Sequence, residues 1–206
     1  MNDIWTPQAA LAPMVIRRDG NQVQAMDIYS RLLEERIIYV IGPVEKYMAN
    51  AVKAQLLLLE AEDPAADITM YIDSPGGEVG TGMGVFDTMN YISCDIRTVC
   101  VGQAASMGSV FLLNGTPGKR FALPNSEIMI HQPSSGCQGK ITDMERSFEH
   151  GKALKERLHR IYADKTGKSI EQIRDDMEHD YWLWPEEAVE YGIIDKVIAT
   201  REEVQA

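Results

Sequence analysis

The chain has 206 residues, and its 31 acidic against 20 basic side chains leave a formal net charge of −11. This acidic balance argues against nucleic acid as the main partner, and no apolar run is long enough to cross a membrane. A chain of this length can bury a core that needs no disulfides, so we expect one domain over residues 1–206.

The cysteines and the N-terminal residues favour a reducing compartment. Cys94, Cys100 and Cys137 are an odd number, at spacings that match no zinc-binding pattern. Asp3 stands where a signal peptide carries positive charge, and Pro13 interrupts the apolar run. We therefore expect a cytoplasmic protein that binds no metal.

Short strands alternate with helices in the first two thirds of the chain. Residues 37–41 (IIYVI), 68–72 (ITMYI) and 97–101 (RTVCV) are rich in β-branched and aromatic side chains and predict buried strands. Apolar residues recur at helical spacing between these strands: Met48, Val52, Leu56 and Leu59, then Met83, Phe86 and Met89. The alternation predicts an α/β fold with a parallel or mixed sheet.

The pattern changes after Gly139. Apolar residues at helical spacing among many charged ones predict one long amphipathic helix: Ile141, Met144, Phe148, Leu154, Leu158 and Ile161. We expect this helix to project or to pack on another subunit. Beyond Gly192 the sequence predicts only a short strand, IIDKVI, and a polar tail.

Residues 162–169 (YADKTGKS) end like a phosphate-binding loop, but Tyr162 stands where the leading glycine is required. A local interpretation is better. Gly167 is suited to end a helix in the left-handed conformation, and Ser169 with Gln172 forms a capping box for the next helix. We expect no nucleotide site and no cofactor, so any dependence on ATP must come from a partner.

Two glycine-rich stretches are candidates for a reactive site. Residues 71–84 (YIDSPGGEVGTGMG) end a strand in Ser-Pro-Gly-Gly, where backbone N–H groups without Cβ atoms could bind an oxyanion. Such turns are also common tight connections. In GQAASMG, residues 102–108, Ser106 either caps a short buried helix or serves as a nucleophile.

His131 follows a short apolar strand, and its imidazole is suited to moving protons near neutral pH. Acyl transfer needs a hydroxyl, a base and N–H donors for the oxyanion. Ser106 and His131 could supply the first two, and the N–H groups of Gly77 and Met107 the third. Spacing alone leaves the orienting carboxylate open among four candidates: Asp143, Asp175, Asp176 and Asp180.

Four motifs resemble the family of ClpP, the proteolytic subunit of the Clp protease: SPGG (74–77), GQAASMG (102–108), LPNSEIMIHQP (123–133) and PEEAVEYGIID (185–195). The resemblance runs nearly end to end. It implies a serine endopeptidase with Ser106 as nucleophile, His131 as base and Asp180 as orienting carboxylate. It also implies that the N–H groups of Gly77 and Met107 form the oxyanion hole.

The resemblance further implies a crotonase-like α/β fold, a spiral of βαβ units with a projecting handle over about residues 132–165. The handle would contain a Gln138–Gly139 strand and the long helix, and would interlock two stacked seven-membered rings around a chamber. Residues of about 10–26, Pro13 to Gln24 in particular, would form axial pore loops that meet an AAA+ unfoldase such as ClpX or ClpA. Residues 1 to about 9 would form a propeptide. The substrates would be unfolded proteins and short peptides.

Some positions depart from the family pattern. Tyr181 stands where the family commonly has an arginine that pairs across the two rings, and Trp184 replaces a small residue. Thr69 replaces an aromatic residue of the unfoldase-binding pocket, and Cys137 replaces a larger handle residue. These changes suit a weakly active or non-catalytic paralogue in a mixed ring, which is the main alternative. An acyl-CoA enzyme of the same fold is a weaker one, because it needs no Ser–His pair.

Overall fold

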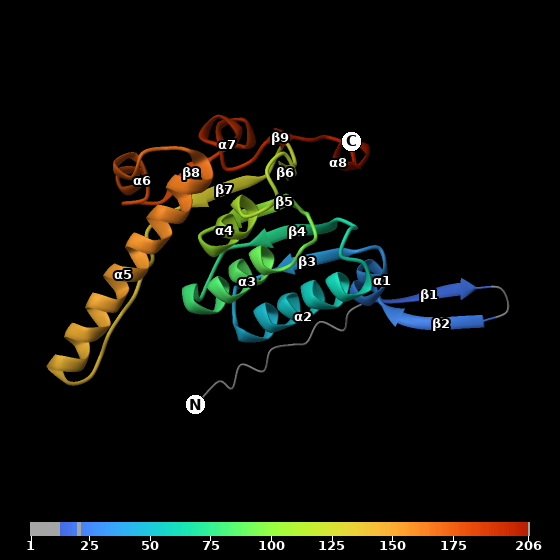
Figure 1. Cartoon of the computed structure of the whole chain (residues 1–206), viewed down its shortest axis with the longest axis horizontal. Coiled ribbons are helices and arrows are strands. Elements are labelled where there is room, and N and C mark those ends of the chain that lie inside the picture. Colours follow the sequence, from blue (N-terminus) through green and yellow to red (C-terminus); the bar gives the residue numbers. More distant parts are fainter. Residues whose placement is uncertain (1–12, 20–21, 206) are drawn as a thin grey trace, which may run out of the picture.

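The computed structural model describes residues 13–19 and 22–205 (Figure 1). The predicted propeptide, residues 1–9, lies outside them, as do residues 10–12 and 20–21 of the predicted pore loops. The strands are β1 (Met14–Asp19), β2 (Gln22–Asp27), β3 (Ile37–Ile41), β4 (Ile68–Ser74), β5 (Ile96–Ala105), β6 (Arg120–Ala122), β7 (Glu127–Ile130), β8 (Tyr181–Leu183) and β9 (Lys196–Val197). The helices are α1 (Ile28–Glu34), α2 (Lys46–Glu62), α3 (Val79–Tyr91), α4 (Met107–Leu113), α5 (Ile141–Thr166), α6 (Ile170–Asp176), α7 (Pro185–Tyr191) and α8 (Glu202–Gln205).

The predicted α/β class is confirmed, with a mostly parallel central sheet. Strands β3, β4, β5, β6 and β9 lie side by side and parallel. The long strand β5 has two partners on one edge, since Thr98–Cys100 pair with β6 and Gln103–Ala105 pair with β7. Strand β8 then pairs antiparallel with β7. Helices α2 and α3 are the crossovers β3–α2–β4 and β4–α3–β5, as expected for βαβ units.

The three predicted strands are confirmed as β3, β4 and β5, and β5 extends four residues further, to Ala105. Side chains of β4 alternate in burial, so that Ile68, Met70 and Ile72 pack in the core beneath the helices. The apolar positions predicted for α2 face the same core, where Val52, Leu56 and Leu59 are almost completely buried.

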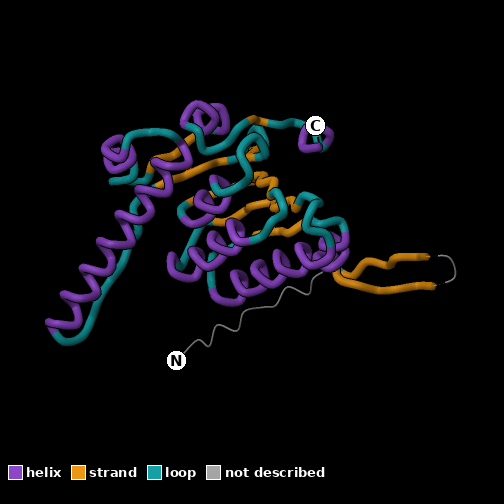
Figure 2. The backbone as a smooth tube through the Cα atoms, in the orientation of Figure 1, coloured by secondary structure: helices purple, strands orange, loops and turns teal. Residues whose placement is uncertain are grey.

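The long helix predicted after Gly139 is confirmed as α5, and it projects from the sheet (Figure 1). Its C-terminal half is anchored by the buried side chains of Leu158 and Tyr162, whereas Ile141 is 72% and Phe148 60% exposed. An extended segment, residues 131–140, runs beside it (Figure 2). Within the described chain Gln138 and Gly139 pair with no other strand, and their predicted part in joining two rings stays a prediction.

Both ends of the described chain form regular structure, a hairpin at the N-terminal end and a short helix at the C-terminal end. The predicted pore-loop region contains a hairpin of β1 and β2, which projects from the sheet and exposes Met14, Ile16 and Val23 (Figure 1). The strand predicted after Gly192 is present as the two-residue β9. The prediction of a merely polar tail is wrong, because α8 places Val204 in a small buried cluster with Val99, Phe121 and Ile198.

The local interpretation of residues 162–169 is supported for Gly167 and for the Ser169 cap, but only half of the predicted capping box forms, because Gln172 Nε2 donates to Asp176 Oδ1 at 2.8 Å. Gly167 ends α5 with φ of +74°, and its N–H donates to the Ala163 carbonyl oxygen at 2.9 Å. Ser169 Oγ accepts the Gln172 N–H at 3.2 Å at the start of α6. These contacts explain the glycine and the serine without a phosphate ligand.

His159 is an ionisable side chain that lies buried in the fold. It lies on α5, fully buried, and neither ring nitrogen has a hydrogen-bond partner. Its nearest carboxylate is that of Glu156, 3.8 Å from Nδ1. Burial lowers the pKa of His159, and this outweighs the opposing effect of Glu156.

Candidate active site

The junction of β5 and α4 holds Ser106 in a strained turn. Strand β5 ends at Ala105 and α4 begins at Met107, so Ser106 alone connects them, with φ of +52° and ψ of −121°. Non-glycine residues rarely adopt positive φ, at a cost of about 1–3 kcal/mol. The side chain makes no capping bond to α4. Ser106 therefore starts a buried helix, as the simpler interpretation held, but its hydroxyl does not cap that helix.

Hydrogen bonds on both sides hold this strained residue. The Ser106 N–H donates to the Met129 carbonyl oxygen at 2.9 Å. Ser109 Oγ donates to the Ser106 carbonyl oxygen and lies 2.7 Å from the Tyr162 hydroxyl. Because the Ser109 hydrogen is already used, the Tyr162 O–H donates to Ser109. Sequence reasoning missed Ser109 and Tyr162, because their spacing in the chain carries no sign of this contact.

The glycine turn after β4 packs directly on Ser106. Gly76 has φ of +89°, and a Cβ built there would lie 2.5 Å from Ser106 Cβ and 2.9 Å from Met107 N. Only glycine fits this approach. Ser74, which precedes the turn, orders it, since its hydroxyl donates to the Gly42 carbonyl oxygen at 2.7 Å and accepts the Gly76 N–H at 3.2 Å.

Two backbone N–H groups are available on this side of Ser106. Met107 is the first residue of α4, so its N–H has no acceptor within the helix. Around Gly77 the backbone bonds use the neighbouring residues, because Val44 N–H donates to the Gly76 carbonyl oxygen and Glu78 N–H to that of Val44. The Gly77 N–H stays outside these bonds.

Strand register brings His131 and Asp180 to Ser106. Parallel pairing of Ala105 with Met129 aligns the ends of β5 and β7, which Ser106 and His131 follow. His131 Nε2 lies 3.0 Å from Ser106 Oγ. Antiparallel pairing of Ile130 with Tyr181 sets Asp180 opposite His131, and its Oδ1 lies 2.8 Å from His131 Nδ1.

The four carboxylates left open by spacing have different positions. Asp180 alone among them contacts His131, and its side chain is 61% exposed. Asp176 accepts from the Tyr191 hydroxyl at 2.6 Å and from Gln172 at 2.8 Å. Asp143 lies in the first turn of α5 and Asp175 on α6, neither with a bond to His131.

The segment before Asp180 is tied to the segment after His131. The Gln132 N–H donates to the Met177 carbonyl oxygen at 2.7 Å, and Gln132 Nε2 donates to that of Glu178 at 2.9 Å. Lys155 of α5 contacts Glu178 Oε2 at 3.0 Å, and this hydrogen bond lowers the pKa of the Glu178 carboxyl. These bonds hold the two sides of the His131–Asp180 pair in one register.

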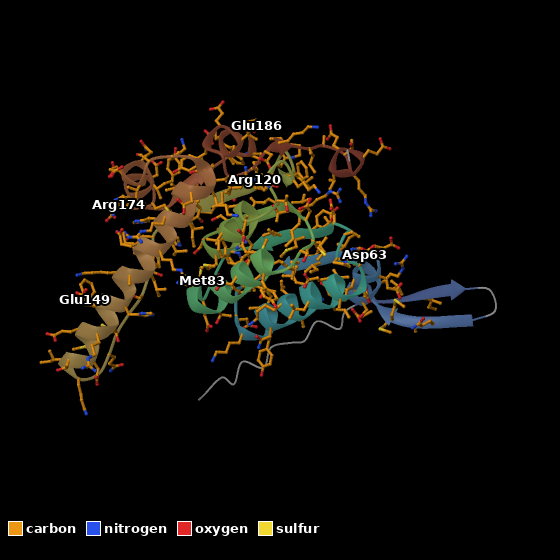
Figure 3. The ribbon with its side chains drawn as sticks, viewed as in Figure 1. Asp63, Met83, Arg120, Glu149, Arg174 and Glu186 are labelled. Carbon is orange, nitrogen blue, oxygen red and sulfur yellow. The ribbon has the colours of Figure 1, made fainter. Side chains whose placement is uncertain are left out.

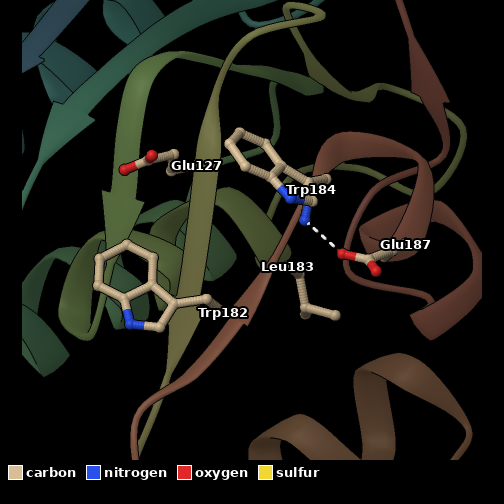
Figure 4. A pocket seen from close by; sticks show the side chains of 5 residues that line it. All are labelled: Glu127, Trp182, Leu183, Trp184 and Glu187. Carbon is tan, nitrogen blue, oxygen red and sulfur yellow. Dashed lines mark hydrogen bonds between the residues drawn. The ribbon is translucent and has the colours of Figure 1, made fainter.

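The aromatic side chains that follow Asp180 lie on β8 and the turn after it. The ring of Tyr181 packs against that of Tyr191, with centroids 5.8 Å apart. Trp182 and Trp184 are about half exposed and line a surface cavity of about 470 Å³ (Figure 4). The backbone N–H of Trp184 donates to Glu187 Oε2 at 2.7 Å, and this bond connects the end of β8 to the first turn of α7.

Within residues 13–19 and 22–205, no three His, Cys, Asp or Glu side chains are grouped to hold a metal ion. None of the helices in this described part is long and apolar enough to cross a membrane.

Comparison with protein families agrees with the motifs. The family model described as Clp protease matches residues 19–201. Together with the mostly parallel α/β sheet, this match shows that the chain belongs to the Clp protease family.

Proposed function

We propose that the chain is a serine endopeptidase subunit that hydrolyses unfolded polypeptides and short peptides. The observation that carries the proposal is the pair of hydrogen bonds that link Ser106 Oγ to His131 Nε2 and His131 Nδ1 to Asp180 Oδ1. A hydroxyl, an imidazole and a carboxylate in this order are the parts that acyl transfer needs.

In this mechanism Ser106 Oγ attacks the scissile carbonyl carbon while His131 Nε2 takes the hydroxyl proton. Asp180 accepts the Nδ1–H of His131, which fixes the tautomer and stabilises the imidazolium. The N–H groups of Gly77 and Met107 stabilise the tetrahedral oxyanion. His131 returns the proton to the departing amine, and water then cleaves the acyl-enzyme by the same steps.

The geometry supports this function over a non-catalytic ring subunit. In that alternative Tyr181 would move the Asp180 carboxylate away from His131. Asp180 Oδ1 lies 2.8 Å from His131 Nδ1, however, while the Tyr181 ring packs on Tyr191. An acyl-CoA enzyme would give no reason for the Ser106–His131 contact.

We also propose that the subunit acts in two stacked seven-membered rings fed by an AAA+ unfoldase of the ClpX or ClpA type. Membership of the family supports assembly in general. The projecting α5 supports it further, because its exposed Ile141 is an apolar side chain that a neighbouring subunit could bury. We expect the protein in the cytoplasm, as a homo-oligomer or in a mixed ring with a paralogue.

Labelling with a fluorophosphonate, read by intact mass, tests the proposal. We expect one adduct on the wild type and none on Ser106→Ala. Peptide cleavage should fall by a factor of about 10⁴ to 10⁶ in Ser106→Ala and nearly as far in His131→Ala, because the groups act as a unit. Ser147→Ala, an exposed serine on α5, is the matched control. Undiminished cleavage by Ser106→Ala would refute the proposal.

A further inference from the structure

A groove of about 380 Å³ is lined at one end by Gly77 and by Gln132, the residue after His131. Its walls are the turn 77–80, the segment 132–135 and one face of α5. Gly77 is the proposed oxyanion donor, and Gln132 directly follows His131. The mouth of the groove therefore adjoins the place of the scissile carbonyl, where it can receive a neighbouring substrate side chain.

Each of the three walls of the groove carries an apolar side chain beside its polar ones. The apolar lining side chains are Val79, Pro133, Phe148 and Leu154. Gly80 also lines the groove, and a Cβ built there would meet no atom within 4 Å, so a larger side chain has room at this position. A long side chain can pack its methylene groups against these walls.

Three charged residues line the groove, and only Lys152 can readily exchange its partner. Glu78 accepts from its neighbour Thr81 at 2.7 Å, and Lys155 is held by Glu178. Lys152 Nζ lies 2.9 Å from Glu149 Oε1, but the two side chains are 55% and 69% exposed, so their attraction is weak.

Lys152 is nevertheless kept at the groove wall. Its Nζ lies 4.7 Å from the centroid of the Phe148 ring, one helical turn earlier on α5. Glu149, its present partner, lies on the projecting part of α5 (Figure 3). A carboxylate that enters the groove can therefore replace Glu149 without moving the ammonium group away from the groove.

We propose that Lys152 determines substrate specificity by favouring a glutamate, and disfavouring a lysine or arginine, at the residue that supplies the scissile carbonyl. The inference rests on the proposed peptidase function. The stem of the substrate side chain packs on Phe148 and Leu154, and its carboxylate pairs with Lys152. A cationic side chain at the same place meets like charge.

The test uses short fluorogenic peptides that differ only in the residue before the leaving group: Glu, Gln, Leu or Lys. For the wild type we expect kcat/KM about threefold or more higher for the Glu peptide than for the Lys peptide. Lys152→Met should bring this ratio close to one, and Lys152→Glu should invert it. Gly80→Leu, which fills the groove, should slow cleavage of all four peptides more than that of an Ala peptide.

Arg157→Glu is the matched charge reversal, on the same helix, exposed and outside the groove. Because each comparison is a ratio within one variant, changes in total activity cancel. A Glu-to-Lys ratio that is unchanged in Lys152→Glu, or equally changed in Arg157→Glu, overturns the specificity proposal and leaves the peptidase function standing. Failure of the wild type to cleave any of the peptides in a Ser106-dependent way overturns both.

Discussion

Gly76 sets how closely the glycine turn approaches Ser106, so its replacement by alanine tests the geometry of the site directly. The added Cβ would lie 2.5 Å from Ser106 Cβ, 2.8 Å from the Ala105 carbonyl oxygen and 2.9 Å from Met107 N. Carbon atoms in contact are normally about 3.5–4.0 Å apart. The turn and the serine must therefore separate by about 1 Å. Alanine must also adopt φ of +89°, which glycine does without strain.

We expect Gly76→Ala to lower kcat/KM for a short peptide about 100-fold, because a displacement of about 1 Å from the reactive geometry costs that much. Backbone strain should lower the free energy of unfolding by about 1–3 kcal/mol. For a chain of this size each kcal/mol corresponds to about 2–4 °C in Tm. Peptide hydrolysis and thermal unfolding followed by circular dichroism measure the two effects.

Gly84→Ala is the matched control for this experiment. Gly84 also lies on the chain after the glycine turn, inside α3, and an added Cβ would meet only the Lys53 side chain at 3.5 Å or more. Alanine in a helix interior is favoured over glycine by about 1 kcal/mol, so this variant should stay folded and active. Wild-type kcat/KM in Gly76→Ala would show that the close approach to Ser106 is unimportant, and the reasoning would fail.

Three further predictions follow from the proposed assembly and from two unusual side chains. The protein alone should cleave short peptides without ATP but leave stably folded proteins intact until an AAA+ unfoldase and ATP are added; degradation of a folded substrate by the protein alone at a comparable rate would contradict the closed chamber. The resemblance to the Clp protease family implies that an arginine at the position of Tyr181 pairs across two rings. Such a charge-assisted hydrogen bond is worth about 1.5–3 kcal/mol, so we expect single or weakly active double rings and a gain in both assembly and cleavage in Tyr181→Arg. Sedimentation at several salt concentrations with peptidase assays checks this, and a stable, fully active wild-type double ring that gains nothing from arginine would disprove it. His159 is buried with a lowered pKa, so the unfolded state takes up this proton at a higher pH than the folded state, and the free energy of unfolding decreases as the pH falls below about 6.5. Urea unfolding should show that His159→Leu is about 1–3 kcal/mol more stable than the wild type at pH 7, with a larger advantage at pH 5; equal pH slopes would count against it.

The sequence by itself determined the class of fold and the local elements. Runs such as IIYVI and ITMYI combine β-branched side chains with the short length of a strand, and the residues of α2 repeat at 3.6-residue spacing. Gly167 and Ser169 were predictable for the same reason, because helix capping depends on neighbours in the chain. The Ser106, His131 and glycine-turn motifs could also be recognised as candidates, since each carries its own chemistry.

Only the tertiary structure decided which of these candidates meet. Asp180 is 49 residues from His131 in the chain, and spacing could not distinguish it from Asp175 or Asp176; the pairing of β8 with β7 brings its carboxylate to the imidazole. The support of Ser106 by Ser109 and Tyr162, the burial of Val204 and the unpartnered His159 arose in the same way. The physical reason is that periodicity reports which side of an element is buried, whereas strand register and helix packing set distances between residues far apart in the chain.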